Sequence, residues 1–278
     1  MGYLVRLFYF GDGFHGSQLQ PGLRTVQGEL ISAVEKWSGE SHSTSTVRLA
    51  GRTDKGVHSI GQIALIDTTE SIDIEGINRH LPPDMCIWAV SRAPDEFDPR
   101  RDVLMRHYRY VLDAHQIDVR LVQEAAQVLT GYHNYRYLSK PDGDRPTTTT
   151  LLSVGVTQTD GLIVIDVFGT SFLWKLVRKA VTLLSRTANR EFTMAEVKEI
   201  VDGRFHPQGG IAPAPPEALF LVESIVPIRL RPSKRAVKRV IKTMASRVSF
   251  LRRSSQALSV IYRQESAGMR LVWRPAKF

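Results

Sequence analysis

The sequence predicts an α+β protein made of two similar halves, each with helices packed on one side of an antiparallel sheet, followed by a basic extension. Three observations predict this layout. Candidate strands and helices alternate in a mixed order twice along the chain. The 278 residues are enough for two domains with a sizeable core. Lys and Arg are concentrated near the end of the chain. We place the parts at residues 1–105, 106–228 and 229–278.

In the first part, Tyr3–Phe10 is rich in aromatic and branched residues and precedes a Gly-Asp-Gly stop, which is typical of a strand. Thr25 can cap a helix that ends before Gly39 and has its apolar residues at helical spacing. Similar signals predict strands at Val47–Ala50, Gln62–Ile66 and Ile87–Val90. They also predict a second helix at Asp73–Leu81, which the following Pro-Pro pair would end.

The second part repeats this mixture. A strand at His107–Leu112 precedes a helix that Asp118 caps and that ends at Leu129, before Gly131. A Thr-Asp-Gly turn predicts a hairpin, and Thr193 and Glu196 form a capping box. The remaining elements are predicted at Leu151–Thr157, Leu162–Phe168, Ser171–Ala188 and Leu219–Ile225.

The extension from Arg229 carries 14 Lys and Arg against one acid, a charge of +13, whereas residues 1–228 carry −4. Such a basic segment attracts polyanions, chiefly nucleic acid or anionic lipid. Ser233 can cap an amphipathic helix that follows it. Further on, Val260–Tyr262 and Arg270–Trp273 could form a hairpin around the Ser-Ala-Gly at 266–268. The cations could bind phosphate, or simply be solvated while the apolar face docks on the body.

Composition excludes several classes of protein. Cys86 is the single cysteine, so an internal disulfide or a cysteine-rich metal site cannot form, and a reducing compartment such as the cytoplasm is expected. No apolar run approaches 18 residues and no signal peptide is recognisable, so we expect no membrane segment. The histidines lack metal-ligand spacing, and we expect no metal.

The stretch Gly11–Gly16 matches the G-x-G-x-x-G pattern of dinucleotide-binding proteins and follows a strand. The pattern requires a helix to open at the third glycine, but Pro21-Gly22 would cut such a helix to under two turns. A glycine-bearing loop near a substrate is the better interpretation, with a nicotinamide oxidoreductase as the competing one.

The stretch Gly51–His58 is the densest in reactive groups. Asp54 stands between two cations, which favour its ionised form, so it could act as a nucleophile or base. A salt-bridged turn explains the same residues. Tyr108 and Arg109 could stack a base and hold a phosphate, or they could belong to a core strand. Arg178 could pair with an acid, or its guanidinium could reach solvent.

Together these residues resemble the tRNA pseudouridine synthase A family. Its motif is similar to Ala50–His58, read as A-G-R-T-D-K-G-V-H. Companion matches occur in order along the chain at Tyr9–Gly16, Arg24–Gln27, Asn78–Pro82, Phe97–Arg100, Tyr108–Tyr110, Phe172-Leu173 with Val177-Arg178, and Ala214–Leu219. Ser17 departs from the family, where many members have Trp, and the extension is absent from the minimal family pattern.

The resemblance implies a pseudouridine synthase fold: two halves related to the ferredoxin-like fold that share a central antiparallel sheet, with a basic cleft between them. It implies isomerisation of uridine to pseudouridine in the anticodon stem-loop of tRNA, around positions 38–40, without a metal or nucleotide cofactor, by a homodimer. The alternative is an RNA-binding protein or RNA chaperone of the same fold without activity.

The resemblance also assigns roles to four residues. Asp54 would be the catalytic carboxylate, Arg178 its partner, Tyr108 the group that stacks on the base and transfers a proton, and Arg52 the group that displaces the flipped nucleotide. We further expect RNA contacts from cationic side chains near the motifs and in the extension: Lys55, His58, Arg100, Arg109, Lys234, Arg235, Lys238 and Arg239.

Overall fold

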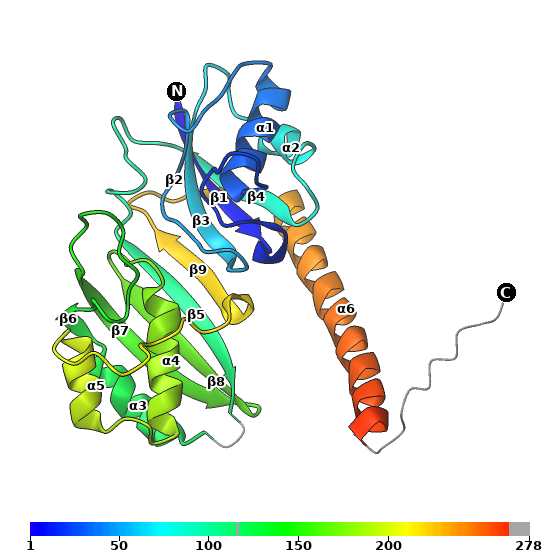
Figure 1. Cartoon of the computed structure of the whole chain (residues 1–278). Coiled ribbons are helices and arrows are strands. Elements are labelled where there is room, and N and C mark those ends of the chain that lie inside the picture. Colours follow the sequence, from blue (N-terminus) through cyan, green and yellow to red (C-terminus); the bar gives the residue numbers. More distant parts are fainter. Residues whose placement is uncertain (115–116, 267–278) are drawn as a thin grey trace.

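The computed structural model describes residues 1–114 and 117–266. Its strands form a single ten-stranded sheet in the order β10-β4-β1-β3-β9-β5-β8-β7-β6, with β2 paired to β3 (Figure 1). The α+β class is confirmed.

The first half of the chain supplies one end of the sheet. Its elements are β1 (Gly2–Tyr9), α1 (Val26–Ser38), β2 (Val47–Leu49), β3 (His58–Asp67), α2 (Ile74–Asn78) and β4 (Met85–Arg92). α1 begins as expected, because the Thr25 hydroxyl accepts the N–H of Gly28, and it ends at Gly39, whose φ is 73°. Alternate residues of β1, including Leu7 and Tyr9, pack under α1 and α2.

The second half supplies the other end. Its elements are β5 (Met105–Asp113), α3 (Val119–Val128), β6 (Gly131–Asn134), β7 (Thr148–Thr159), β8 (Leu162–Gly169), α4 (Leu176–Ala188), α5 (Met194–Val201) and β9 (Leu219–Ile225). The predicted capping box of Thr193 and Glu196 is present. β6 was not expected, and α4 begins five residues later than predicted, because Lys175 takes a left-handed φ of 66° just before it.

The two halves meet where β3 runs parallel to β9, with His58 opposite Phe220 and Ser59 opposite Leu221. The expectation of an antiparallel central sheet is therefore wrong at this junction, whereas the other strand pairs within the described residues are antiparallel. Tyr9 is paired with Ser59, and Ser59 with Leu221, so Tyr9 in the core under α1 and α2 and Leu221 in the core under α3, α4 and α5 point to the same face of the sheet. Both layers of helices therefore cover that face. We call this the helical face and the other the back face.

The back face of the first half is covered by α6 (Lys234–Ser266), which follows the short β10 (Arg231–Pro232). α6 continues well past the sheet as a projecting rod (Figure 1). Val260–Tyr262 lies inside this helix, so the predicted hairpin is wrong, and its other strand, Arg270–Trp273, lies outside the described residues. No helix in the described part of the chain is long and apolar enough to cross a membrane.

Candidate active site

The loop between β2 and β3 is held by the segment that leads into α1. The Thr53 N–H donates to Ser17 Oγ at 2.8 Å, and the Ser17 N–H donates to the Thr53 carbonyl at 3.0 Å. The Tyr9 hydroxyl lies 2.9 Å from Thr53 Oγ1. These bonds fix the backbone directly before Asp54, and they give Ser17, which departs from the family pattern, a structural role.

The glycine pattern at Gly11–Gly16 packs against the same loop. A Cβ on Gly11 would lie 2.2 Å from the carbonyl oxygen of Val57, so no larger residue fits there. Only a three-residue 3₁₀ turn forms at Gly11–Gly13, and α1 begins at Val26. The helix that a dinucleotide site needs at the third glycine is absent from this described stretch, which argues against the oxidoreductase interpretation.

The Asp54 carboxylate accepts hydrogen bonds at both oxygens. Arg178 Nη1 lies 2.7 Å from Oδ2, and Trp174 Nε1 lies 2.9 Å from Oδ1. Guanidinium and indole nitrogens can only donate, so both carboxyl oxygens act as acceptors. One fifth of the Asp54 side chain remains exposed, so a substrate can reach it.

Arg178 is positioned by the start of α4 and by the proline-rich segment before β9. Its Nε donates to the Ala214 carbonyl at 2.6 Å, and the Ala214 N–H donates back to the Arg178 carbonyl at 3.0 Å. The side chain is only 12% exposed. A buried cation needs such a set of partners, so the interpretation of Arg178 as a solvent-reaching surface residue is wrong.

Tyr108 lies on the helical face of β5, beside Phe172, whose ring meets it edge-on at 4.8 Å between centroids. Burial raises the pKa of Tyr108 well above its usual value, and the nearby Tyr9 hydroxyl and Asp54 carboxylate raise it further, against the opposing effect of Arg106. The phenol therefore keeps its proton at neutral pH. The structure thus brings Asp54, Tyr108 and Arg178 to one place, as the resemblance implies.

Comparison with known proteins decides the family. A family model described as tRNA pseudouridine synthase matches residues 125–225. "tRNA pseudouridine synthase A" of Methanosarcina acetivorans is 38% identical over 221 residues, covering 78% of this chain and 82% of that protein. The protein of the same name from Methanosarcina barkeri is 41% identical over 184 residues (65% and 68%), and that from Pyrococcus abyssi is 34% identical over 220 residues (78% and 82%). The chain belongs to the tRNA pseudouridine synthase A family.

Among solved structures, a chain from "Crystal Structure of a Cbf5-Nop10-Gar1 Complex" matches with a TM-score of 0.31 and 10% identity, covering 66% of this chain and 54% of that one. This similarity is too low to support an argument. Membership of the synthase family rests on the sequence relatives.

Trp174 is a site residue of this family member that the sequence analysis missed. It belongs to the bend before α4, and its indole reaches a carboxylate 120 residues earlier in the chain. Two ammonium groups make cation–π contacts with its ring: Lys140 Nζ lies 4.0 Å and Lys175 Nζ 5.8 Å from the ring centroid. Its place next to the Phe172-Leu173 match was the one available signal.

Arg52 projects from the same loop as Asp54 and is more than half exposed. Its Nη1 lies 3.3 Å from Asp142 Oδ1, in the segment between β6 and β7. An exposed pair of this kind is worth about 0–1 kcal/mol, so an RNA phosphate could displace Asp142 at little cost.

The expected RNA contacts divide into several groups. Lys55, beside Asp54, and Arg100 are exposed. Arg109 is exposed too, but it forms a two-fold ion pair with Asp166, at 2.8 and 3.0 Å, on the back face of the sheet, away from Tyr108.

His58 is 5% exposed, its Nδ1 accepts the Gly11 N–H at 2.9 Å, and its Nε2 lies 3.0 Å from the Glu217 carbonyl oxygen. The expectation that His58 contacts RNA is therefore wrong: both ring nitrogens hold the chain together.

In the extension, Lys234, Arg235 and Lys238 are exposed. Arg239 differs from them. Its Nη1 donates to the Asn78 carbonyl at 2.7 Å, and its Nη2 lies 3.3–3.5 Å from further carbonyl oxygens of Leu81, Pro82 and Met85. These hydrogen bonds fasten α6 to the segment from the end of α2 to the start of β4, so part of the Arg239 guanidinium is already engaged within the protein, and its contact with RNA stays a prediction.

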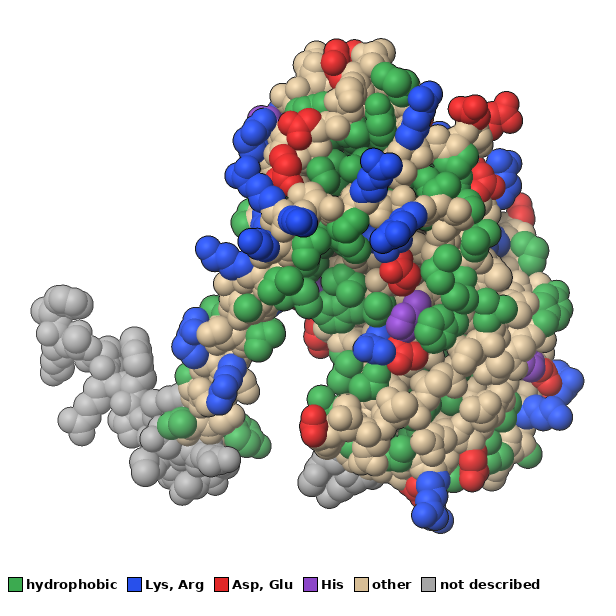
Figure 2. Space-filling view, turned by 180° about the vertical axis from the view of Figure 1, so that it is seen from behind, with side chains coloured by type: hydrophobic (Ala, Val, Ile, Leu, Met, Phe, Trp, Pro, Cys, Tyr) green, Lys and Arg blue, Asp and Glu red, His purple; other side chains and the backbone are tan. Residues whose placement is uncertain are grey.

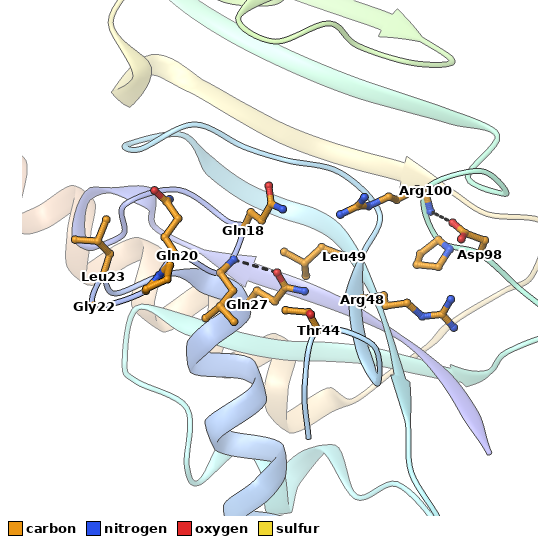
Figure 3. Close-up of a pocket in the computed structure, with 13 residues that line it drawn as sticks. Gln18, Gln20, Gly22, Leu23, Gln27, Thr44, Arg48, Leu49, Asp98 and Arg100 are labelled. Atoms are coloured by element: carbon orange, nitrogen blue, oxygen red, sulfur yellow. Dashed lines mark hydrogen bonds between the residues drawn. The ribbon is translucent and has the colours of Figure 1, made fainter. Parts of the chain in front are cut away.

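A groove of about 720 Å³ lies beside the loop that holds Asp54. Figure 3 shows Gln20 at one end and Arg48 and Arg100 at the other, with Gln18 and Gln27 between them. Gln27 is fixed there, because it accepts the Leu19 N–H and donates to the Val47 carbonyl. Asp54, Tyr108 and Arg178 do not line the groove, so it adjoins the candidate active site without containing it.

Within residues 1–114 and 117–266, His, Cys, Asp and Glu side chains form no group of three or more that could hold a metal ion.

Proposed function

We propose that this chain isomerises uridine to pseudouridine in tRNA. The observation that carries the proposal is the Asp54 carboxylate, held at one oxygen by Arg178 and at the other by Trp174, beside the buried ring of Tyr108. The names of the family and of its relatives, all tRNA pseudouridine synthases, support the same activity, which is that of an isomerase.

The reaction moves one bond and one proton within the nucleotide. The bond between ribose C1′ and uracil N1 breaks, the uracil rotates, C5 bonds to C1′, and the proton of C5 is lost while N1 gains one. No oxidant, reductant or energy source is needed. One ionised carboxylate is sufficient, whether it attacks the sugar or the base or removes a proton from the sugar, and Asp54 is that group in our proposal.

Tyr108 would stack on the uracil and handle the C5 proton. Because burial keeps the phenol protonated, it cannot simply act as a base in the resting protein. It can relay a proton, passing its own proton to a neighbouring acceptor as it receives one from C5. Arg178 and Trp174 are positioning residues, since both act on the substrate through Asp54.

The target base must leave its stack to reach Asp54, which costs a few kcal/mol. Arg52 would offset part of this cost by exchanging Asp142 for the RNA and filling the vacated space. Lys55 and Arg100 would hold phosphates on either side, and the groove with Arg48 and Arg100 would receive an adjoining part of the RNA. Lys234, Arg235 and Lys238 would extend the phosphate contacts along α6.

The finer features implied by the resemblance belong to the same proposal. They are a target in the anticodon stem-loop around positions 38–40, a homodimeric protein and a cytoplasmic location. The exposed basic side chains around Asp54, Arg52 and Lys55, support an RNA substrate.

The test is incubation of the purified protein with unmodified tRNA transcripts, followed by mapping of pseudouridine along each transcript. We expect product at positions 38–40, and loss of product when those uridines are replaced by cytidine. Product only at other positions would overturn the assignment of the site but not the reaction. Tight tRNA binding without pseudouridine on any transcript would favour the alternative, an RNA-binding protein without activity.

A further inference from the structure

The groove beside the loop between β2 and β3 is held by the same hydrogen bonds as that loop. On one wall, Gln18 directly follows Ser17, which makes two hydrogen bonds to the loop, at 2.8 and 3.0 Å. On the other wall, Arg106 Nη2 donates to the carbonyl of the residue before the loop at 2.7 Å and to the Arg100 carbonyl at 3.4 Å. The groove is therefore held in a fixed position relative to Asp54, and an RNA bound at Asp54 passes close to it.

The lining of the groove combines apolar side chains with two free polar groups. Leu49 is 5% exposed and forms part of the floor, and Leu19 lines the groove nearby. Figure 3 shows the Arg100 side chain pointing back toward Gln18, on the side of Leu49 that faces them. Within the described residues, neither the Gln18 amide nor the Arg100 guanidinium has a hydrogen-bond partner. Asp98 also lines the groove, but its carboxylate accepts two N–H groups of the turn that follows it, at 2.7 and 3.2 Å.

These groups match the chemistry of an unpaired nucleotide. Each RNA base carries a donor next to an acceptor on its Watson–Crick edge, and a glutamine amide offers the complementary acceptor and donor. That edge is free only in an unpaired base, and proteins recognise single-stranded RNA by contacts to it. An apolar side chain can cover a face of such a base, and a guanidinium binds phosphate oxygens. The volume of about 720 Å³ lies in the range that encloses a single small molecule, so it suits a nucleotide and not a duplex.

The cations beside the groove are free to bind RNA, whereas those on the back of the sheet are matched by acids. Figure 2 shows acidic and basic side chains close together on the back face, where Arg109 makes its ion pair with Asp166. Arg100 and Lys55 are exposed and form no ion pair within the described part of the chain. Phosphates of a bound RNA can therefore pair with them without displacing an acid.

We propose that the groove binds one unpaired nucleotide of the same RNA strand that places its uridine at Asp54. The phosphate of this nucleotide binds Arg100, its base lies against Leu49 and Leu19, and its Watson–Crick edge pairs with the Gln18 amide. Because any base can meet a glutamine in this way, the contact recognises the unpaired state and not a sequence. The groove thus favours a uridine close to an unpaired loop over one inside a long duplex. The inference rests on the proposed function, which makes RNA the ligand, and adds a second nucleotide position to it.

The experiment measures equilibrium binding of a hairpin RNA with the sequence of an anticodon stem-loop. In a series of such hairpins, one loop nucleotide at a time is replaced by an abasic one. We expect one of these replacements to weaken binding to the wild-type protein about 5- to 50-fold, and Gln18→Leu to weaken binding of the intact hairpin by a similar factor. The same replacement should have little further effect on Gln18→Leu, because both changes remove one contact.

The salt dependence of binding tests the phosphate contact. Arg100→Gln should make the slope of log affinity against log salt concentration shallower by about 0.7, the value for one phosphate of a single strand. Arg101→Gln is the matched control, because Arg101 is the neighbouring exposed cation, pairs with Asp102 at 3.1 Å and does not line the groove. It should leave the slope unchanged. Since Arg100 is exposed in a loop, this arm stays valid even if Gln18→Leu fails to fold.

The outcomes distinguish this proposal from the proposed function. Abasic effects that are independent of Gln18 at every loop position would overturn the groove contact, even if the wild-type protein forms pseudouridine. Equal slopes for Arg100→Gln and Arg101→Gln would overturn the assignment of the phosphate. Coupling of Gln18 to one loop nucleotide, in a protein that forms no pseudouridine on any transcript, would support the groove contact and overturn the isomerase.

Discussion

Replacing Trp174 by Phe tests whether the indole N–H aims the catalytic carboxylate. The substitution removes a 2.9 Å hydrogen bond to Asp54 Oδ1 and keeps an aromatic ring under Lys140. A hydrogen bond to a charged group contributes about 1.5–3 kcal/mol. Because the Trp174 side chain is 39% exposed, water can replace part of it, and the lower half of that range applies. We expect kcat to fall about 10- to 30-fold.

The assay is steady-state pseudouridine formation over a range of tRNA concentrations, which gives kcat and KM separately. A group that only aims Asp54 should lower kcat and leave KM within about twofold, because its effect is made in the transition state. Trp37→Phe, in α1, is the matched control and should retain wild-type kcat. An unchanged kcat in Trp174→Phe, or a fall confined to KM, would refute the positioning role.

Three further predictions concern other parts of the structure. In Arg178→Lys the shorter ammonium group cannot reach both Asp54 and the Ala214 carbonyl. The single-turnover rate constant should fall about 10- to 100-fold while tRNA affinity stays nearly unchanged. A large loss of affinity would indicate direct contact of Arg178 with RNA. Gly56→Ala puts a Cβ 2.7 Å from Pro216 at a φ of 84° and should lower the free energy of unfolding, measured in urea, by about 1–3 kcal/mol. Gly155→Ala, whose Cβ would meet open space, should lower it little. Equal effects of the two substitutions would contradict the argument. Burial lowers the pKa of His58 below 6.5, so on acidification the unfolded chain takes up the proton before the folded protein does. The free energy of unfolding should therefore fall as the pH drops below about 6.5. If His58→Asn shows the same fall in a pH series, His58 is not its source.

Local signals in the sequence predicted most helix starts and strand positions. Thr25 and Thr193 cap the helices they were expected to cap, because an N-cap depends on a few adjacent residues. The Asp-Gly turn at 160–161 joins two strands for the same reason. The hairpin at Val260 failed, because a short run of β-branched residues also fits a helix and the longer helical spacing prevails.

Features that depend on distant segments could not be predicted. The parallel junction of β3 and β9 joins residues such as Ser59 and Leu221, and no local pattern specifies which strands become neighbours. That junction also explains His58. The residue lies in a reactive-looking stretch, yet β3 begins at His58 and pairs it with Phe220, which buries it.

The candidate site likewise contains residues that the sequence could predict and residues that it could not. Asp54, Tyr108 and Arg178 could be named from the resemblance, and the structure places them together. Trp174 could not be assigned, because only the tertiary structure brings its indole to Asp54. The charge of Arg239 is visible in the sequence and predicts an RNA contact, whereas the carbonyl oxygens to which it donates are brought together only by the fold.

The central claim is that Asp54 performs chemistry and is not merely part of an RNA-binding surface. The direct test is Asp54→Asn, with tRNA binding and single-turnover pseudouridine formation measured on the same preparation. The account predicts tRNA affinity at least as high as that of the wild type, since a negative charge is removed from a cationic site, and product formation reduced by more than about a thousandfold. Product formation within tenfold of the wild type would contradict it.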